Sequence, residues 1–187
     1  MVTDGAPIAA RPDSAVTVPE PELAVVITAT SEVFGYTVCD DVSSRDIEGE
    51  NPLYPPQAKV YAGSCALAPG IRPAWEVRDV GALAIEVRVT RDGATAFEGS
   101  TSTARMHRSV PDLVDHLVRA QDFPAGAVLS TGTGIVPDLD FTLLDGDVVE
   151  VTVEEVGTLV NPVGTLEAAR TAVAVRLAAG RGELARS

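Results

Sequence analysis

Three carboxylates and one amine are the residues of this sequence most suited to chemistry. Glu20 and Glu22 stand in the segment VPEPELAVVI, Asp41 follows the apolar segment VFGYTV, and Lys59 is the only lysine of the chain. Carboxylate oxygens suit Mg²⁺, Mn²⁺ or Ca²⁺, whereas Zn²⁺ prefers nitrogen and sulfur ligands. Together these residues predict a hard-cation site with an amine beside it.

The spacing of the acidic residues indicates how they could converge. In an extended segment, residues two apart project to the same side, so Glu20 and Glu22 would face one point ahead of a buried strand. Asp41 comes at the end of the next apolar segment, and its neighbour Asp40 should point to the opposite face. The alternative is that Glu20 and Glu22 belong to a solvated strand edge.

Lys59 lies in PPQAKVYAGSCALAP, a weakly charged stretch of small and apolar residues. The pKa of a lysine is readily changed by burial or by a nearby cation, so Lys59 could serve as acid, base or carboxylate clamp. The alternative is a surface ammonium. Weaker candidates for substrate contacts are Thr131 and Thr133 in a glycine-rich turn, and Arg45, which could equally form an ion pair with Asp46.

Short β-type segments must position these residues. Apolar runs at 23–29 and 33–38 flank the acidic positions, and residues 83–89 alternate between apolar and polar as a half-buried strand does. Asp92-Gly93 and Asp145-Gly146 are turn signals. The fold class expected from this pattern is mainly β with few helices, that is, α+β.

Two segments are predicted to be helical. SVPDLVDHLVRAQ begins with Ser109 as a cap, followed by an apolar stripe, and it carries His116 on its surface. Residues 164–187 are predicted to form a helical tail. Residues 1–18 have no sustained period and are expected to be a leader or linker, which leaves 19–163 as the catalytic core.

Composition narrows the function classes. The 187 residues carry a formal net charge of −13, which argues against nucleic-acid binding. No stretch is apolar enough for a membrane span, and no signal segment is evident, so we expect a cytoplasmic protein. Cys39 and Cys65 lack metal-binding spacing and are interpreted as reduced, largely buried thiols.

The ordered motifs resemble the fumarylacetoacetate hydrolase superfamily over about residues 19–163. They are EPELAVVI, GYTVCDDVSSRD, the single lysine, TGT, and GDVVEV followed by GTLVN. The segment SSRDIEGENPLYPPQAKVYAGSCALAP looks specifically like the branch that dehydrates 2-keto-3-deoxy-pentonates such as arabinonate and xylonate.

The resemblance implies a mixed β-sandwich roll that carries one divalent cation, usually Mg²⁺. By the family's motif, Glu20, Glu22 and Asp41 would be ligands, Lys59 the catalytic lysine, and Thr133 a contact to the substrate carboxylate. It also implies a homodimer or higher homo-oligomer. The expected activity is a lyase that dehydrates a 2-keto-3-deoxy sugar acid to 2-oxoglutarate semialdehyde through a metal-stabilised enolate.

Two alternatives remain open from the sequence. One is a hydrolase or decarboxylase of a 2-oxo acid such as an acylpyruvate or oxaloacetate. Family hydrolases use a histidine-glutamate pair on a lid, and neither His107 nor His116 stands in such a setting. The other is a truncated, inactive metal-binding homologue or subunit, because dehydratases of this branch have a substantial region before the core.

Overall fold

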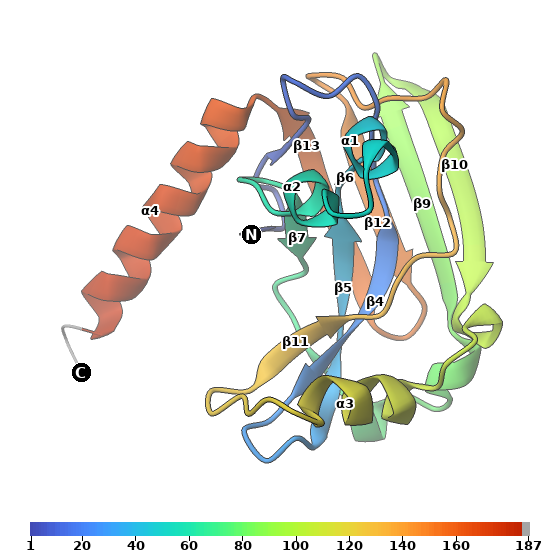
Figure 1. Ribbon diagram of the computed structural model, residues 1–187, viewed down its shortest axis with the longest axis vertical. Coiled ribbons are helices and arrows are strands. Elements are labelled where there is room, and N and C mark those ends of the chain that lie inside the picture. The colour runs from blue at the N-terminus through green and yellow to red at the C-terminus, as the bar shows by residue number, and fades with distance from the viewer. Residues whose placement is uncertain (185–187) are drawn as a thin grey trace.

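The computed structural model describes residues 1–184, with side chains described to residue 179, and its body is built from two β-sheets packed face to face (Figure 1). The first sheet has the strand order β1-β7-β5-β4-β11, with β8 also paired to β5. Its strands are β1 (Val2–Thr3), β4 (Pro21–Ile27), β5 (Val33–Asp41), β7 (Cys65–Leu67), β8 (Arg72–Pro73) and β11 (Ala127–Ser130).

The second sheet has the order β10-β9-β12-β13-β2, and a separate two-stranded ribbon joins β3 to β6. The strands of the second sheet are β2 (Ile8–Ala9), β9 (Ala84–Arg91), β10 (Ala94–Ser102), β12 (Val148–Val153) and β13 (Gly157–Gly164), and the ribbon consists of β3 (Thr17–Val18) and β6 (Ser43–Ser44). The β9–β10 hairpin turns at Asp92-Gly93, both with positive φ, as predicted.

The core lies between the two sheets and follows from strand alternation. On β4 the odd-numbered Leu23, Val25 and Ile27 face inward, and on β12 Val149, Val151 and Val153 do the same. Val87 on β9 belongs to the same cluster. The predicted mainly β class and the mixed β-sandwich are therefore confirmed. The polar positions of the first sheet are left on its other face, where the candidate site lies.

Four α-helices accompany the sheets within residues 1–184. They are α1 (Arg45–Glu50), α2 (Pro55–Lys59), α3 (Val110–Val118) and α4 (Leu166–Leu184). The predicted Ser109 cap is present in α3 as a capping box, in which the Ser109 hydroxyl accepts the Asp112 N–H and the Asp112 carboxylate accepts the Ser109 N–H. The predicted helical tail corresponds to α4, which extends from the sandwich (Figure 1); residues 185–187 lie outside the described part.

The N-terminal segment differs from the sequence prediction. Residues 1–18 were expected to be a leader or linker, yet β1 pairs with β7 and β2 with β13, both in parallel. Val2, Ile8 and Val18 are fully buried. The segment makes only two-residue strands, which are too short to show a sequence period, so its part in the core could not be recognised from pattern alone. Among the described helices, none is long and apolar enough to cross a membrane.

Candidate metal centre

The register of the first sheet brings the predicted carboxylates together on its outer face. β4 and β5 are antiparallel, with Glu22 opposite Cys39, and Glu20 directly precedes β4. The backbone N–H of Asp41 donates to the carbonyl of Glu20 at 3.0 Å. Glu20, Glu22 and Asp41 each offer a carboxylate oxygen, and these oxygens lie within 4.8 Å of one another. The predicted convergence is confirmed.

Lys59 completes this cluster from the C-terminal end of α2. Its Nζ donates to Glu20 Oε2 at 2.7 Å and to Asp41 Oδ2 at 2.8 Å. Burial alone would lower the pKa of Lys59, but the hydrogen bonds and charges of Asp41 and Glu20 outweigh it and raise the pKa above its ordinary value. The side chain is 23% exposed, so Lys59 is a partly buried ammonium clamped between two carboxylates.

Local sequence explains why α2 presents Lys59 here. The helix begins with Pro55 and Pro56, which suit the first helical turn because they need donate no N–H there. Ala58 is fully buried, and α2 contacts α1 and the ribbon strand β6. Beyond the helix, the Ser64 hydroxyl donates to the Lys59 carbonyl at 2.7 Å. These contacts fix the backbone from which the ammonium reaches the carboxylates.

Glu22 is the most enclosed carboxylate of the three, with 3% of the residue exposed. Its Oε2 accepts the backbone N–H of Gly132 at 2.8 Å and the hydroxyl of Ser130. Burial raises the pKa of Glu22, and the negative charges of Asp41 and Glu20 act in the same direction against these hydrogen bonds. A cation beside Glu22 would offset the free-energy cost of keeping this buried carboxylate charged. Ser130 and Gly132 were not recognised as site residues from sequence.

Asp40 points away from its neighbour, as strand alternation predicts. It is 1% exposed, its Oδ1 accepts the backbone N–H of Glu20 at 3.0 Å, and its Oδ2 has no hydrogen-bond partner. Burial raises the pKa of Asp40 to about 8, against the effect of the Glu20 N–H. Asp40 therefore holds the backbone that carries Glu20 and does not belong to the carboxylate cluster.

Arg45 lies near the cluster, but not in the ion pair considered from sequence. Its Nη1 is 3.8 Å from Glu20 Oε1 and 3.3 Å from Glu48 Oε2. Asp46 instead accepts the hydroxyl of Ser14 and the N–H of Ala15. The alternative of an Arg45–Asp46 ion pair is thus wrong, because Asp46 is directed toward the N-terminal segment that was taken for a leader.

Thr131 and Thr133 lie on the turn after β11 and bind the edge of β4. The Thr131 hydroxyl donates to the Leu23 carbonyl at 2.7 Å, and the Thr133 hydroxyl donates to the Pro21 carbonyl at 2.9 Å. Between them, the N–H of Gly132 reaches Glu22. The turn therefore holds the strand that carries Glu22 in place, and in this arrangement each threonine has its hydroxyl proton engaged.

The two cysteines lie on the same face as the carboxylates. Cys39 is opposite Glu22, and Cys65 is opposite Asp41 in the β5–β7 pair. Their Sγ atoms are 3.9 Å apart, and both thiols are free. The hydrogen bond with Cys65, and then burial, raises the pKa of Cys39. Cys39 is buried as expected, whereas Cys65 is only half-buried. Their contact was not predicted, although alternation already places residues 39 and 41 on one face.

The donor set fits a hard cation. Oxygens on opposite sides of a Mg²⁺ ion are about 4.2 Å apart, so oxygens within 4.8 Å need only a small adjustment. In the structure, the Lys59 ammonium supplies a positive charge between Glu20 and Asp41. No His or Cys joins this group within the described residues, which fits Mg²⁺, Mn²⁺ or Ca²⁺ better than Zn²⁺.

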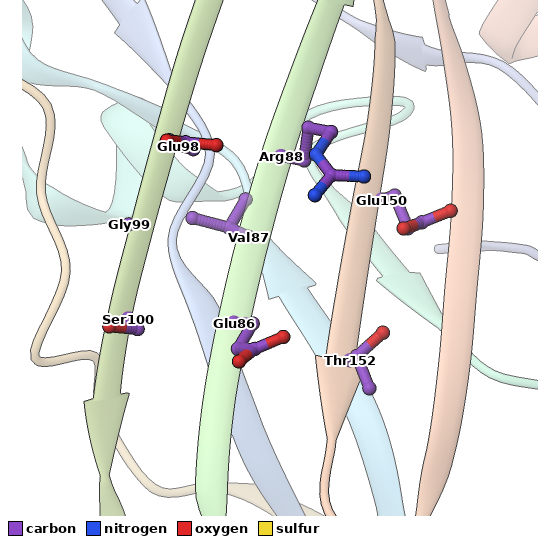
Figure 2. Close-up of a pocket in the computed structure, with 8 residues that line it drawn as sticks. All are labelled: Glu86, Val87, Arg88, Glu98, Gly99, Ser100, Glu150 and Thr152. Carbon is purple, nitrogen blue, oxygen red and sulfur yellow. The ribbon is translucent and has the colours of Figure 1, made fainter. Parts of the chain in front are cut away.

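Two hollows are present among the described residues, and the second reaches the turn whose Gly132 N–H binds Glu22. One, of about 390 Å³, is on the outer face of the second sheet, where Glu86, Arg88 and Glu150 project beside one another (Figure 2). Their neighbours Val87, Val149 and Val151 face the core, so this is the solvated side of an alternating sheet. The other, of about 340 Å³, lies between residues 101–108 and 131–134 and includes His107.

Comparison with known proteins places this geometry in a family. Residues 1–164 match the model of the fumarylacetoacetate (FAA) hydrolase C-terminal domain. The chain is 47% identical over 162 residues to 2-dehydro-3-deoxy-D-arabinonate dehydratase of Saccharolobus solfataricus, a match that covers 87% of this chain and 54% of the relative. It is 45% identical to a probable 2-keto-3-deoxyxylonate dehydratase of Haloferax volcanii, covering 88% and 57% of the two chains.

A solved structure agrees with these sequence matches. It is 2-keto-3-deoxy-D-arabinonate dehydratase complexed with magnesium and 2,5-dioxopentanoate, with a TM-score of 0.85 and 46% identity over 87% of this chain and 58% of that chain. The chain spans little more than half the length of the relatives it matches. On its sequence and its fold, the chain belongs to the fumarylacetoacetate (FAA) hydrolase C-terminal family.

Proposed function

We propose that this chain carries the metal centre and catalytic lysine of a lyase that dehydrates a 2-keto-3-deoxy-pentonic acid to 2,5-dioxopentanoate, which is 2-oxoglutarate semialdehyde. The observation that carries the proposal is the ammonium of Lys59 held between two carboxylates of a three-carboxylate cluster. It is supported by 45–47% identity to a dehydratase and a probable dehydratase of such acids.

Glu20, Glu22 and Asp41 would hold the cation, with Mg²⁺ as first choice. When bound, the cation supplies positive charge that stabilises the negative charge developing on the keto oxygen of a 2-oxo acid. The protein's part is to fix the three carboxylates. Strand pairing fixes Glu22 and Asp41, the Asp40 carboxylate holds the Glu20 backbone, and the Gly132 turn orients Glu22.

Lys59 is proposed to move the protons. In the structure it is held as an ammonium by Glu20 and Asp41, which makes it a poor base. Once the charge of those carboxylates is balanced, the interactions that raise its pKa weaken, and its amine becomes available. Removal of a C3 proton and loss of the C4 hydroxyl expel one water, and the enone then rearranges to the C5 aldehyde.

Three further residues are proposed as substrate contacts. Arg45 is a third exposed and lies near Glu20, so we assign its guanidinium to the substrate carboxylate. Thr131 and Thr133 already donate to backbone carbonyls, so their hydroxyls would act on a substrate only as acceptors, from its hydroxyl groups. The carboxylate contact expected of Thr133 would therefore require its hydroxyl to turn away from the Pro21 carbonyl.

A second candidate is an enzyme that acts on oxaloacetate or a similar 2-oxo acid. The observation that favours it is 30% identity over 159 residues to oxaloacetate tautomerase YisK of Bacillus subtilis. Hydrolysis is less supported, because the described residues that line the hollow of His107, which include Thr131 and Thr133, contain no glutamate to pair with it, and His116 is on α3. The third candidate is a metal-binding subunit that needs another chain.

We also propose that the chain forms a homo-oligomer, which light scattering would test.

Product analysis distinguishes these candidates. Purified protein with Mg²⁺ would be incubated separately with 2-keto-3-deoxy-D-arabinonate and with oxaloacetate, and followed by proton NMR. The proposal predicts the aldehyde of 2,5-dioxopentanoate from the first substrate. Enolisation or decarboxylation of oxaloacetate without any aldehyde would support the second candidate. Bound metal without turnover of either compound would refute the lyase for this chain and favour the subunit.

A further inference from the structure

The two thiols of the chain are placed against the proposed metal ligands. Cys39 and Cys65 lie on adjacent strands, β5 and β7, with their sulfurs 3.9 Å apart. Cys39 is the cross-strand partner of Glu22, and Cys65 is the partner of Asp41. Residues opposite one another in an antiparallel pair share a sheet face. The sulfurs therefore form part of the surface on which the carboxylates stand.

The thiols differ in their access to solvent. Cys39 is 1% exposed, whereas Cys65 is partly exposed. Cys39 also contacts Ser130, whose Oγ is 3.7 Å from the Cys39 sulfur and which donates to Glu22. An oxidant from solution would thus meet Cys65 first, and the sheltered Cys39 would be the second, resolving thiol.

We propose that Cys39 and Cys65 are an oxidation site, in which a hydroperoxide converts the two thiols to a disulfide that weakens cation binding by the adjacent carboxylates. This inference rests on the proposed metal site but not on the proposed dehydration. Nothing in the mechanism above uses either sulfur, so the pair is free to serve this separate role.

The chemistry requires one hydroperoxide for each disulfide. The Cys65 sulfur attacks an oxygen of hydrogen peroxide, breaks the O–O bond and becomes a sulfenic acid as one water is released. The Cys39 sulfur then attacks the Cys65 sulfur, forms the S–S bond and releases the second water. Two electrons pass from the thiols to the peroxide, and both thiol hydrogens leave in water.

The coupling to the metal site follows from distance. A disulfide bond is about 2.05 Å long, so closure draws the sulfurs together by about 1.9 Å from their separation of 3.9 Å. The movement is made by side chains opposite Glu22 and Asp41 and in contact with Ser130. Disturbing groups that orient ligands typically lowers metal affinity by about tenfold or more. By linkage, bound cation should disfavour the disulfide at equilibrium by the same factor.

The test uses the whole protein and Mn²⁺ as the probe. Reduced protein and protein treated with hydrogen peroxide would be digested and mapped by mass spectrometry, and Mn²⁺ affinity would be measured by electron paramagnetic resonance. We expect a peptide linked through Cys39 and Cys65, Mn²⁺ affinity lowered about tenfold or more, and a smaller disulfide fraction at equilibrium in a glutathione buffer when Mn²⁺ is present. Thiols that stay reduced, or a disulfide with unchanged Mn²⁺ affinity, would overturn the proposal.

Two variants keep the result interpretable. Cys65→Ser removes the partly exposed thiol and should bind Mn²⁺ like reduced wild type before and after peroxide. Cys39→Ser tests the resolving role and should stop at oxidised Cys65 without a linked peptide. Loss of Mn²⁺ affinity in peroxide-treated Cys65→Ser would contradict the disulfide. Reduced wild type that binds no Mn²⁺ would overturn the proposed metal site and the coupling, whereas the linked peptide decides the disulfide independently.

Discussion

Replacing Lys59 by methionine tests whether the ammonium and the cation use the same carboxylates. Its Nζ lies 2.7 Å from Glu20 and 2.8 Å from Asp41, so each attraction is about 6 kcal/mol at an effective dielectric of about 20, before the cost of desolvation. Removing one partner of a largely buried pair costs about 3 kcal/mol or more. We therefore expect Lys59→Met to lose about 3 kcal/mol of unfolding free energy in the absence of metal.

Saturating cation should recover most of that loss, because it balances the same carboxylates. A recovery of about 3 kcal/mol corresponds to roughly a hundredfold tighter cation binding by the variant than by wild type. Urea unfolding in chelator and in saturating Mn²⁺, with Mn²⁺ affinity from electron paramagnetic resonance, measures both quantities. Dehydration should be lost in Lys59→Met even when its metal site is filled.

Arg45→Met is the matched control. Arg45 approaches the same Glu20 carboxylate, but at 3.8 Å and with a third of its side chain exposed, so the expected loss is below about 1 kcal/mol. Equal destabilisation of Lys59→Met with and without Mn²⁺, or no tightening of Mn²⁺ binding, would refute the reasoning, because the Lys59 ammonium and the cation would then occupy separate places.

Three further predictions concern the geometry of the site and its support. Glu22→Gln should keep the Gly132 hydrogen bond and should not change the unfolding free energy in chelator, because burial already disfavours the charged carboxylate. It should nevertheless lower the Mn²⁺ affinity at least about tenfold, which a titration would measure. Gly132→Ala and Gly146→Ala, with φ of 90° and 91° and open space around an added Cβ, should each lose about 1 kcal/mol in urea unfolding. Only Gly132→Ala should lower Mn²⁺ affinity, and equal affinities would contradict the role of the Gly132 N–H. Burial would raise the pKa of Asp147, but Arg91 and the Leu144 N–H lower it, so its stabilisation is full above about pH 4 and fades as pH falls further. Asp147→Asn should lose about 2 kcal/mol at pH 7 and less in acid, and a loss that did not shrink in acid would contradict this.

Local pattern predicted the parts of the site that obey strand alternation. The i, i+2 spacing placed Glu20 and Glu22 together, and the end of an apolar segment placed Asp41 beside them, as the register of β4 and β5 now shows. The fact that Lys59 is the only lysine drew attention to it. Alternation also predicted the buried face of β9, because the strand is long enough to show its period.

Long-range pairing decided what the sequence missed. Ser130 and Gly132 reach Glu22 only because β11 pairs with β4, more than a hundred residues away along the chain. The thiol contact depends on the register of β7 against β5, which no local feature reveals. Likewise, β1 and β2 gain their stability from partners far away in sequence and not from their own two residues.

The most direct test of the central claim is to measure bound Mn²⁺ and dehydration rate on the same samples. Metal-free protein would be titrated with Mn²⁺, with bound ion followed by electron paramagnetic resonance and 2,5-dioxopentanoate by NMR, in wild type and in Glu22→Gln. We predict a rate that rises in proportion to bound Mn²⁺ up to one ion per chain, and a loss of both in the variant. Full occupancy without water elimination, or elimination that persists in chelator, would contradict the account.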